Sequence, residues 1–526
     1  MTQTAQISTD RTRAIRLRTR LRLPLPVAVA AVLLALELAA ILWLGAGRFS
    51  YTLDDAYIHL AVSEELARGG YGINAGEFAA PASSILWPAL LAPFAPFAWH
   101  RFVPLILNIA ALLGCVAILC RLIGTALQDR AATALPNGLA LLLPLAAGLV
   151  PIAFTGMEHL LQAWLGLAAI LGVVVARQEG TAPRWLWPAL AVAPLVRYES
   201  LAMTLPLAAL LWRGGYRRQV AATLGALALC LAGFSALLLS HGLPPLPSSV
   251  LSKAGFAGAD LSLTVSLLAG LGRQFAQGEG WLLLALIVAL LSTAVLVRRR
   301  RGLALALASA TALHLLFGLT RTSFGRYEAY ILVADLAFLA TLAAPRLAAL
   351  AAARGAALAL IAAGLLLTPL WPTALTRLAA VPLAADNIVS QQREMRRFAT
   401  EFWAGPVAVN DLGWVSYRNE AHVLDLWGLG YEEARRRRIS GERGWAEELL
   451  GRRDVALMMV YDGWLGREVP PGWVPIGRLA LTRKRMSPAE AEVGFYARPD
   501  RAPELAAAAR RFAAGLPEGA NFRFPD

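Results

Sequence analysis

Cysteine and charge are scarce in this chain: it has three cysteines, and charged residues make up only 16% of its 526 residues. The cysteines, Cys115, Cys120 and Cys230, all lie inside apolar runs, which excludes a disulfide framework as the source of stability. Hydrophobic residues make up 57% of the chain, and its mean hydropathy is +0.55. This composition is typical of a protein whose solvent is mostly lipid rather than water.

Lysine is almost absent too, because Lys253 and Lys484 are the only lysines and nearly every cation is an arginine. The formal net charge is +14, which in a soluble protein would raise the question of nucleic acid. Here the arginines fall in short clusters between apolar runs, an arrangement that orients membrane helices. We therefore predict contact with membrane lipid and no nucleic-acid partner.

Eleven apolar runs are predicted to cross the membrane as helices. A single span needs about 20 apolar residues, and two shorter runs are counted as a helical hairpin. Nine of them lie near residues 25–46, 102–124, 137–153, 159–176, 218–240, 281–297, 302–319, 329–345 and 355–371. A further pair, at about 185–197 and 199–212, is predicted to form a hairpin of two short helices that turns at Arg197-Tyr198-Glu199. The stretch Ile85–Ala98 is short and contains three prolines, which favours an interfacial or re-entrant helix over a span.

Arginine placement assigns a side of the membrane to each connection. Residues 1–24 are basic, and the run after them is longer than the apolar region of a signal peptide, so we predict an uncleaved membrane helix. Arginine clusters recur on every second connection, and the positive-inside rule places them and the N-terminus in the cytoplasm. The sequence thus predicts a multi-pass protein of the inner (plasma) membrane, with an acidic loop at 47–84 outside the cytoplasm.

The polar C-terminal part, residues 372–526, is predicted to be a small extracytoplasmic α/β domain that follows a transmembrane module at 25–371. Its length is usual for one domain. Strands are expected at Val407–Val409, His422–Leu426, Val455–Tyr461 and Gly477–Leu481, and helices at Ile388–Trp403 and Pro503–Ala514. This part has no nucleophile–base arrangement or metal-ligand spacing that indicates chemistry of its own.

Acids, cations and a histidine gather on the connections that are predicted to lie outside. They are Asp54, Asp55 and His59 in the first connection, Glu158 in the second, Arg197, Tyr198 and Glu199 in the third, Lys253 in the fourth, and Arg326 and Glu328 in the fifth. A carboxylate in such a place can take the proton of an acceptor, and cations can stabilise a departing phosphate. The set therefore indicates an enzyme that moves a group from a phosphate carrier in the membrane.

The motifs on these connections resemble those of the GT-C glycosyltransferases. They are Asp54-Asp55-Ala56-Tyr57-Ile58, Ser83-Ser84-Ile85-Leu86-Trp87, Thr155-Gly156-Met157-Glu158, Arg197-Tyr198-Glu199 and Leu246-Pro247-Ser248-Ser249 with Lys253. The segments 410–415 and 423–429 resemble the external domain of a bacterial subgroup. That subgroup includes arabinofuranosyltransferases of actinobacterial cell walls and related mannosyl- and aminoarabinose-type transferases. The resemblance covers nearly the whole chain.

The resemblance implies a membrane all-α GT-C helix bundle of about 11 transmembrane helices with a small C-terminal extracytoplasmic α/β domain. It also implies an inverting hexosyl- or pentosyltransferase, with a polyprenyl-phosphate sugar as donor and an extracytoplasmic glycan or glycolipid as acceptor. Asp55 or Asp54 would be the catalytic base, with Asp55 preferred. Lys253, Arg197 and Arg326 would bind the donor phosphate. The supporting residues would be His59, Glu158, Tyr198, Glu199 and Glu328.

These residues also have structural interpretations. Asp54 can cap the helix that follows it. Arg197 can pair with Glu199, and Arg326 with Glu328, as charges within membranes usually do. Two neighbouring carboxylates can also hold a divalent metal, although no spacing in the sequence requires one. The sequence therefore leaves open whether the protein uses a divalent metal as a cofactor.

A transporter or a lipid-carrier flippase is the alternative function. Three ionisable residues lie at predicted membrane depth: Glu37, His314 and Asp335. Ionisable residues within a membrane are candidates for function. The alternative is that these three form one paired, buried cluster. Transporters place substrates near the bilayer midplane and have related halves, whereas this chain has no internal repeat. A third interpretation is a structural subunit of an envelope assembly, which the acidic loop and Lys253 disfavour. Instead of binding a phosphate, Lys253 could anchor the chain at the membrane interface.

Overall fold

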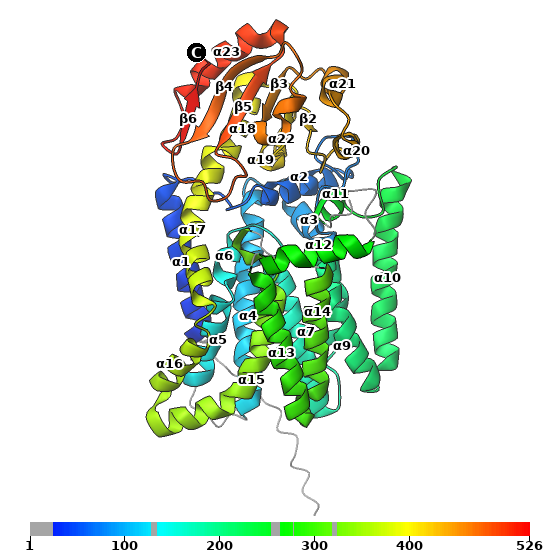
Figure 1. Cartoon of the computed structure of the whole chain (residues 1–526), viewed down its shortest axis with the longest axis vertical. Coiled ribbons are helices and arrows are strands. Elements are labelled where there is room, and N and C mark those ends of the chain that lie inside the picture. Colours follow the sequence, from blue (N-terminus) through cyan, green and yellow to red (C-terminus); the bar gives the residue numbers. More distant parts are fainter. Residues whose placement is uncertain (1–24, 128–133, 254–262, 277, 318–322, 526) are drawn as a thin grey trace, which may run out of the picture.

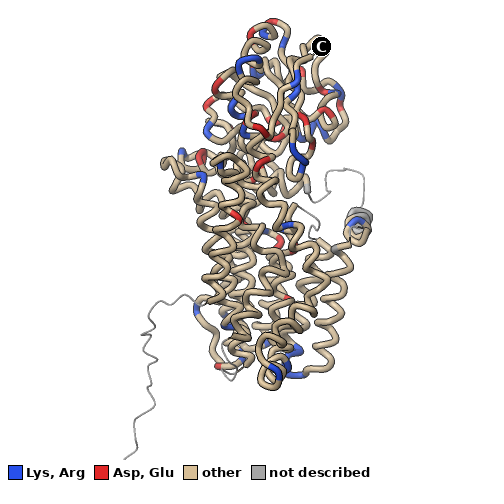
Figure 2. The backbone as a smooth tube through the Cα atoms, turned by 90° about the vertical axis from the view of Figure 1, so that its left-hand side faces the viewer, with Lys and Arg blue, Asp and Glu red and all other residues tan. Residues whose placement is uncertain are grey.

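The computed structural model describes residues 25–127, 134–253, 263–276, 278–317 and 323–525. Helices form an elongated bundle, and a sheet with its own helices lies at one end of that bundle (Figure 1). We refer to residues 391–525 as the sheet domain. Acidic and basic residues gather in the sheet domain and at the opposite end of the bundle, whereas the middle of the bundle has few of them (Figure 2).

The apolar runs form the helices of the bundle, because a backbone in lipid must bond its polar groups within its own segment. These helices are α1 (Leu25–Leu44), α4 (Val103–Leu127), α5 (Ala134–Ala146), α6 (Leu149–Ala153), α7 (His159–Glu179), α8 (Leu186–Val196), α9 (Leu201–Arg213), α10 (Arg217–Ser240), α12 (Leu263–Ala276), α13 (Glu279–Leu296), α14 (Arg301–Phe317), α15 (Ala329–Arg354), α16 (Ala356–Leu366) and α17 (Trp371–Ser390). The short helices α2 (Asp55–Ala67), α3 (Leu86–Leu91) and α11 (Ser248–Lys253) lie near the sheet domain (Figure 1).

Within the described residues, five helices are long and apolar enough to cross a membrane singly. They are α1, His100–Leu127, α7, α10 and α15. Two bent helix pairs raise the number to seven if each pair is one span, so the predicted number of eleven is not confirmed. The predicted run 137–153 is divided into α5 and α6 at Gly148, whose φ of +69° is a conformation that favours glycine.

The predicted hairpin at 185–212 is present in the structure. Helices α8 and α9 are joined by the short 3-10 turn Tyr198–Ser200, and Arg197 has an extended backbone between α8 and that turn. An extended residue before a tight turn reverses the chain, which brings the two short helices side by side. We call Arg197, Tyr198, Glu199 and Ser200 the arginine turn.

The sheet domain confirms the prediction of a small α/β domain. Its six strands are β1 (Val407–Val409), β2 (Val423–Asp425), β3 (Leu457–Val460), β4 (Val474–Leu481), β5 (Glu492–Ala497) and β6 (Ala520–Arg523), in the order β2-β1-β3-β5-β4-β6. β1 is parallel to β2 and β3, and the other pairs are antiparallel. Its helices are α18 (Gln392–Arg397), α19 (Gly413–Ser416), α20 (Glu432–Ser440), α21 (Trp445–Arg452), α22 (Asp462–Leu465) and α23 (Ala502–Ala513). The sequence did not indicate β5 and β6.

The first external loop and α17 hold the sheet domain on the bundle. α17 packs along α1 and leads into the sheet domain (Figure 1). In the loop, the Asn74 side chain accepts from the Val423 N–H over 2.9 Å and donates to the Val423 carbonyl over 3.0 Å. Glu77 pairs with Arg453 at 2.5 Å. Asn74 therefore occupies the edge of β2 as a neighbouring strand would, which fixes the loop against the sheet.

Candidate active site

The candidate site begins at α2, where Asp54 precedes the helix and Asp55 is its first residue. We call these two residues the aspartate turn. Arg326 donates from Nη2 to Oδ2 of Asp55 over 2.8 Å. The Asp55 side chain is 36% exposed, whereas Asp54 is buried. Of the two neighbouring carboxylates, Asp55 is thus the one that an incoming molecule can reach.

Asp54 is held by the sheet domain rather than by its own helix, to which its side chain makes no capping bond. Its carboxylate oxygens accept from the backbone N–H groups of Gly413 (2.7 Å) and Trp414 (2.8 Å), 359 and 360 residues further along the chain. The Trp414 ring stacks on Tyr57, with centroids 4.0 Å apart. Burial raises the pKa of Asp54 well above its ordinary value, and the charge of Asp411 raises it further. The aspartate turn is therefore part of an interface.

Gly413 is the closest point of this interface. A Cβ added there would clash with the carbonyl oxygen and the carboxylate of Asp54. We expect Gly413→Ala to lower the free energy of unfolding by about 1–3 kcal/mol, as overpacking does. Thermal unfolding of the purified protein in detergent measures the change. Gly451→Ala is the matched control, because a Cβ at Gly451 meets open space within a helix. Equal thermal midpoints for the two variants would contradict the close contact.

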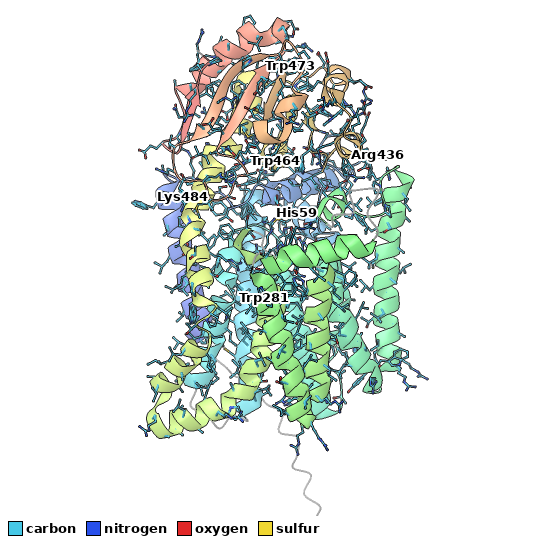
Figure 3. The ribbon with its side chains drawn as sticks, viewed as in Figure 1. His59, Trp281, Arg436, Trp464, Trp473 and Lys484 are labelled. Atoms are coloured by element: carbon cyan, nitrogen blue, oxygen red, sulfur yellow. The ribbon has the colours of Figure 1, made fainter. Side chains whose placement is uncertain are left out.

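A buried polar group centred on Glu158 lies beside the aspartate turn. Arg197 Nη1 donates to Glu158 Oε1 over 2.7 Å, and the Ser83 hydroxyl donates to the same oxygen over 3.1 Å. His59 Nε2 lies 3.6 Å from Glu158 Oε2. His59 is on α2, four residues after Asp55, at the end of the bundle that faces the sheet domain (Figure 3). Burial alone would raise the pKa of Glu158, but His59 and Arg197 outweigh it, so its pKa lies below the ordinary value.

The Arg197 guanidinium is occupied by protein acceptors. Its Nε and Nη2 donate to the two carboxylate oxygens of Glu199, over 3.1 and 2.5 Å, so the expected Arg197–Glu199 pair is present. Nη1 donates to Glu158 and to Ser83. The guanidinium carbon lies 4.7 Å from the centroid of the Tyr327 ring. These contacts favour a role for Arg197 in holding the site together over direct contact with a phosphate.

Arg326 differs from Arg197, because the described part of the chain supplies an acceptor to only part of its guanidinium. Nη2 donates to Asp55, whereas the buried Nε and Nη1 atoms have no hydrogen-bond partner among the residues that the structure describes. The alternative pairing of Arg326 with Glu328 is wrong: Glu328 accepts from Arg377 of α17 over 3.2 Å. Buried N–H groups without an acceptor are costly, so an anion that reached these two donors would be stabilised by them.

Two more of the predicted site residues are Tyr198 and Lys253. Tyr198 is half-buried, and its hydroxyl has no hydrogen-bond partner in the described part of the chain. Lys253 ends α11, whose first residue, Ser248, donates its N–H to the carbonyl of Ala80 over 3.0 Å. The Lys253 side chain lies outside the described residues. Its contact with a phosphate stays a prediction.

Glu37, His314 and Asp335, which the sequence predicts at membrane depth, do not share one set of contacts among the described residues. Asp335 accepts from a threonine of α14 over 2.7 Å. His314 lies 3.2 Å from the Tyr330 hydroxyl, and that hydroxyl donates to the Glu199 carbonyl over 2.8 Å. His314 and Tyr330 therefore support the arginine turn, whereas Glu37 belongs to α1. Among the described residues, no group of three or more histidines, cysteines and acids is arranged to hold a metal ion.

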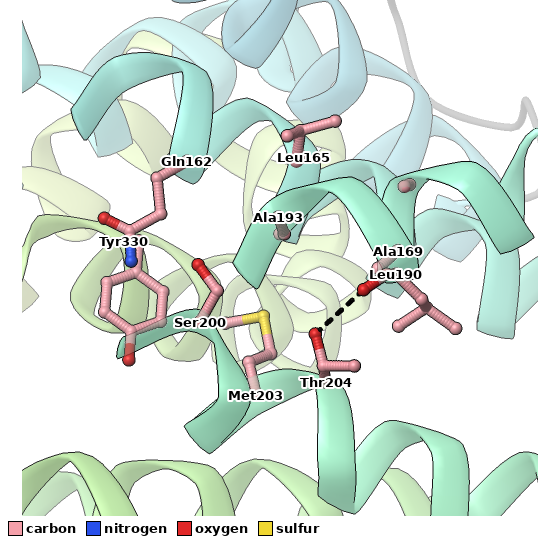
Figure 4. Close-up of a pocket in the computed structure, with 11 residues that line it drawn as sticks. Gln162, Leu165, Ala169, Leu190, Ala193, Ser200, Met203, Thr204 and Tyr330 are labelled. Carbon is pink, nitrogen blue, oxygen red and sulfur yellow. Dashed lines mark hydrogen bonds between the residues drawn. The ribbon is translucent and has the colours of Figure 1, made fainter. Parts of the chain in front are cut away.

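A small pocket lies next to the arginine turn, between α7, α8, α9 and α15 (Figure 4). Gln162 and Ser200 line it; both are buried, and the Gln162 amide and Ser200 hydroxyl have no partner among the described residues. Thr204 also lines the pocket, but it donates to the Leu190 carbonyl over 3.2 Å. The cavity volume is about 10 Å³, roughly the room that one water molecule needs. It suits ordered water, which bonds to such groups.

Sequence reasoning missed the contribution of the sheet domain to this site. Asp411, Gly413 and Trp414 were noted only as part of a motif, without a contact to the aspartate turn. A signal was present, because the segment 410–414 directly follows β1, at the carboxyl end of parallel strands. Functional residues of α/β sheets gather at such ends. Ser83 and Tyr327 were likewise not predicted as site residues.

Comparison with known proteins gives three findings. Two crystal structures of ArnT from Cupriavidus metallidurans are similar to this chain, each at 14% identity. The one bound to undecaprenyl phosphate has a TM-score of 0.48, with 90% of this chain and 97% of that chain covered. The apo one has a TM-score of 0.49, with 92% and 98% covered. No curated protein matches the sequence. A family model described as a domain of unknown function (DUF8728) matches residues 386–496, which include the 410–414 segment.

Proposed function

We propose that this chain is an integral membrane glycosyltransferase of the GT-C class, which moves a sugar from a polyprenyl phosphate to a glycan or glycolipid acceptor. The observation that carries the proposal is the Asp55–Arg326 pair. It joins a partly exposed carboxylate to an arginine whose Nε and Nη1 donors are buried and have no acceptor among the described residues. A base and an anion-binding cation at one place are what transfer from a phosphate carrier requires. The ordered motifs of the sequence support the same class.

Asp55 is proposed as the general base of an inverting displacement. Its carboxylate takes the proton of the acceptor hydroxyl while that oxygen forms a bond to the anomeric carbon of the donor sugar. The bond from the anomeric carbon to the phosphate oxygen breaks, and polyprenyl phosphate leaves with the electron pair. Arg326, together with Lys253, stabilises the negative charge on the departing phosphate. Asp54 and Arg197 hold the aspartate turn and the arginine turn in place.

The site lies where the two substrates of such a reaction would meet. The aspartate turn is at the end of the apolar bundle and in contact with the sheet domain. The lipid carrier is proposed to approach from the bundle and the acceptor from the side of the sheet domain. The positive-inside rule supports an inner-membrane protein with a cytoplasmic N-terminus, because arginines gather at the end of the bundle opposite the sheet domain (Figure 2).

The decisive experiment offers the purified protein a panel of polyprenyl-phosphate sugars and measures released polyprenyl phosphate. We expect release that depends on an added glycan or glycolipid acceptor and disappears in Asp55→Asn. Release without an acceptor would show hydrolysis of the donor instead of transfer. Failure of the folded protein to release carrier phosphate from any donor in a broad panel would overturn the proposal and favour transport of the lipid carrier.

Arg326 gives a separate test of donor binding. We expect Arg326→Gln to raise the donor KM by roughly ten- to a hundredfold, in line with about 1.5–3 kcal/mol for a hydrogen bond to a charged group. The acceptor KM should change much less. Initial rates at varied donor concentration measure the effect. Arg213→Gln is the matched control, because Arg213 is an exposed arginine at the end of α9. An unchanged donor KM in Arg326→Gln would rule out the phosphate contact.

A further inference from the structure

Two tryptophans of the sheet domain lie partly exposed at the carboxyl end of its parallel strands. Trp427 follows β2, and Trp464 lies in α22, which follows β3. Their ring centroids are 4.3 Å apart, with the planes tilted by 35°. Trp464 is 42% exposed and Trp427 is half-buried, and neither ring is part of the buried core of the domain. We call Trp427 and Trp464 the tryptophan pair. It occupies the end of the sheet at which α/β domains bind their ligands.

The loop that carries Trp427 is held in one conformation by Asp425 and Arg438. The two carboxylate oxygens of Asp425 accept the backbone N–H groups of Trp427 (2.9 Å) and Gly430 (2.7 Å). Arg438 of α20 donates from Nε to the Trp427 carbonyl over 3.0 Å, and its guanidinium carbon lies 3.8 Å from the centroid of the Trp427 ring. The ring on which Trp464 packs is thus fixed before a ligand arrives, so a ligand at the tryptophan pair would lose little free energy to ordering the protein.

A chain of direct contacts links the tryptophan pair to the aspartate turn. Trp464 packs edge-on against Tyr461, with ring centroids 5.5 Å apart. The Tyr461 hydroxyl lies 3.0 Å from Asp411 Oδ2. Asp411 belongs to the segment 410–414, which donates two backbone N–H groups to Asp54. Figure 3 shows Trp464 at the end of the sheet domain that faces the bundle. The tryptophan pair is therefore on the side from which the acceptor is proposed to approach.

Carboxylates lie beside the exposed ring of Trp464. A Cβ added at Gly463, the residue before Trp464, would clash with the Glu490 carboxylate, so that carboxylate lies against this turn of the chain. Asp462, 30% exposed, accepts from the Tyr496 hydroxyl over 2.7 Å. A sugar ring has an apolar face of C–H groups and a rim of hydroxyl groups. An aromatic ring matches the apolar face, and carboxylate oxygens accept hydrogen bonds from the hydroxyl groups. The combination therefore fits a saccharide better than a purely apolar partner.

We infer that the tryptophan pair is a saccharide subsite for the acceptor. The Trp464 ring stacks on one sugar residue of the acceptor glycan, and Trp427 supports that ring from beneath. Glu490 accepts hydrogen bonds from the hydroxyl groups of the same sugar. The subsite thus holds the acceptor on the sheet domain, next to the segment that fixes the aspartate turn. That the bound saccharide is an acceptor rests on the proposed function; the affinity of the tryptophan pair for a saccharide does not.

Saturation-transfer difference NMR of the full chain, in a detergent without sugar groups, tests the subsite without turnover. The probes are linear oligosaccharides of glucose, mannose and arabinose. We expect saturation to reach the C–H protons of at least one probe in the wild type. The signal should be lost in Trp464→Ala and largely kept in Trp464→Phe, which retains a flat ring. Phe524→Ala is the matched control, because Phe524 is 45% exposed and follows β6, at the opposite edge of the sheet from β2. A wild type that saturates none of the probes, or a Trp464→Ala variant that equals it, would overturn the inference.

Transfer kinetics separate the subsite from the proposed function. We expect Trp464→Ala to raise the acceptor KM by roughly two- to tenfold, the size of one aromatic contact, while the donor KM and the thermal midpoint stay near those of the wild type. If a saccharide binds through Trp464 but no donor releases carrier phosphate, the subsite stands and the proposed function fails. If transfer proceeds and Trp464→Ala keeps the wild-type acceptor KM, the acceptor role of the subsite is overturned while the function stands.

Discussion

Replacing Asp55 by asparagine is expected to lower sugar transfer by about 100- to 10,000-fold, the usual contribution of a general base. Asparagine has nearly the shape of aspartate, so the hydrogen bond from Arg326 can persist while the proton acceptor is lost. Release of polyprenyl phosphate in the presence of acceptor measures the effect. The donor KM should stay near that of the wild type, because the change removes an interaction with the acceptor proton.

Asp54→Asn is the matched control for this prediction, since it makes the same chemical change one residue earlier. Each carboxylate oxygen of Asp54 accepts a hydrogen bond from one backbone N–H group. An asparagine has one side-chain oxygen, so its NH2 group would face the second N–H donor. We therefore expect Asp54→Asn to lower the thermal midpoint, whereas Asp55→Asn should leave it nearly unchanged. Normal transfer by both variants, each in stably folded protein, would rule out an aspartate base at this turn.

Replacing Glu158 by alanine is expected to lower the free energy of unfolding by about 3–5 kcal/mol, the cost of removing one partner from a buried ion pair. Glu158 is fully buried, so its loss leaves Arg197 and His59 facing an empty site. Chemical or thermal unfolding of the purified protein in detergent measures the change. Glu504→Ala should change stability by no more than about 1 kcal/mol, because the Arg501–Glu504 pair is exposed.

The same carboxylate gives a second signature at acid pH. The folded-state pKa of Glu158 lies below its ordinary value, so the stabilisation is complete above the unfolded pKa of about 4.3 and is lost as the pH falls through the lower folded value. Glu158→Gln should therefore remove part of the acid sensitivity of the wild type. Identical unfolding of Glu158→Gln and the wild type between pH 3 and pH 6 would contradict a buried ion pair at this position.

The sequence was informative about the helices and about the residues that carry charge. Apolar runs separated by arginines predicted the bundle, and the reversal at the arginine turn followed from requiring arginines on alternate connections. The small α/β domain also followed from its short apolar strands. The number of spans did not follow, because length and hydropathy cannot distinguish a helix that crosses the membrane from one that is broken, as at Gly148, or bent, as between α16 and α17.

The pairing of the charged residues was less predictable than their identity. Arg197 pairs with its sequence neighbour Glu199, as local proximity indicated. Arg326 does not pair with Glu328. Helix α2 brings Asp55 to Arg326, and helix α17 brings Arg377 to Glu328. A guanidinium bonds to whichever carboxylate packing leaves within reach, so the choice between a near and a distant partner depends on the whole bundle.

The sequence by itself determined that this chain places most of its acids and arginines between apolar runs, because charged side chains are costly inside them. It also determined that two aspartates lie together at the start of a helix. Only the tertiary structure decided how they differ. The segment 410–414, more than 350 residues away, lies against the buried Asp54 and donates two N–H groups to its carboxylate. Asp55 points instead to Arg326, and its side chain is 36% exposed.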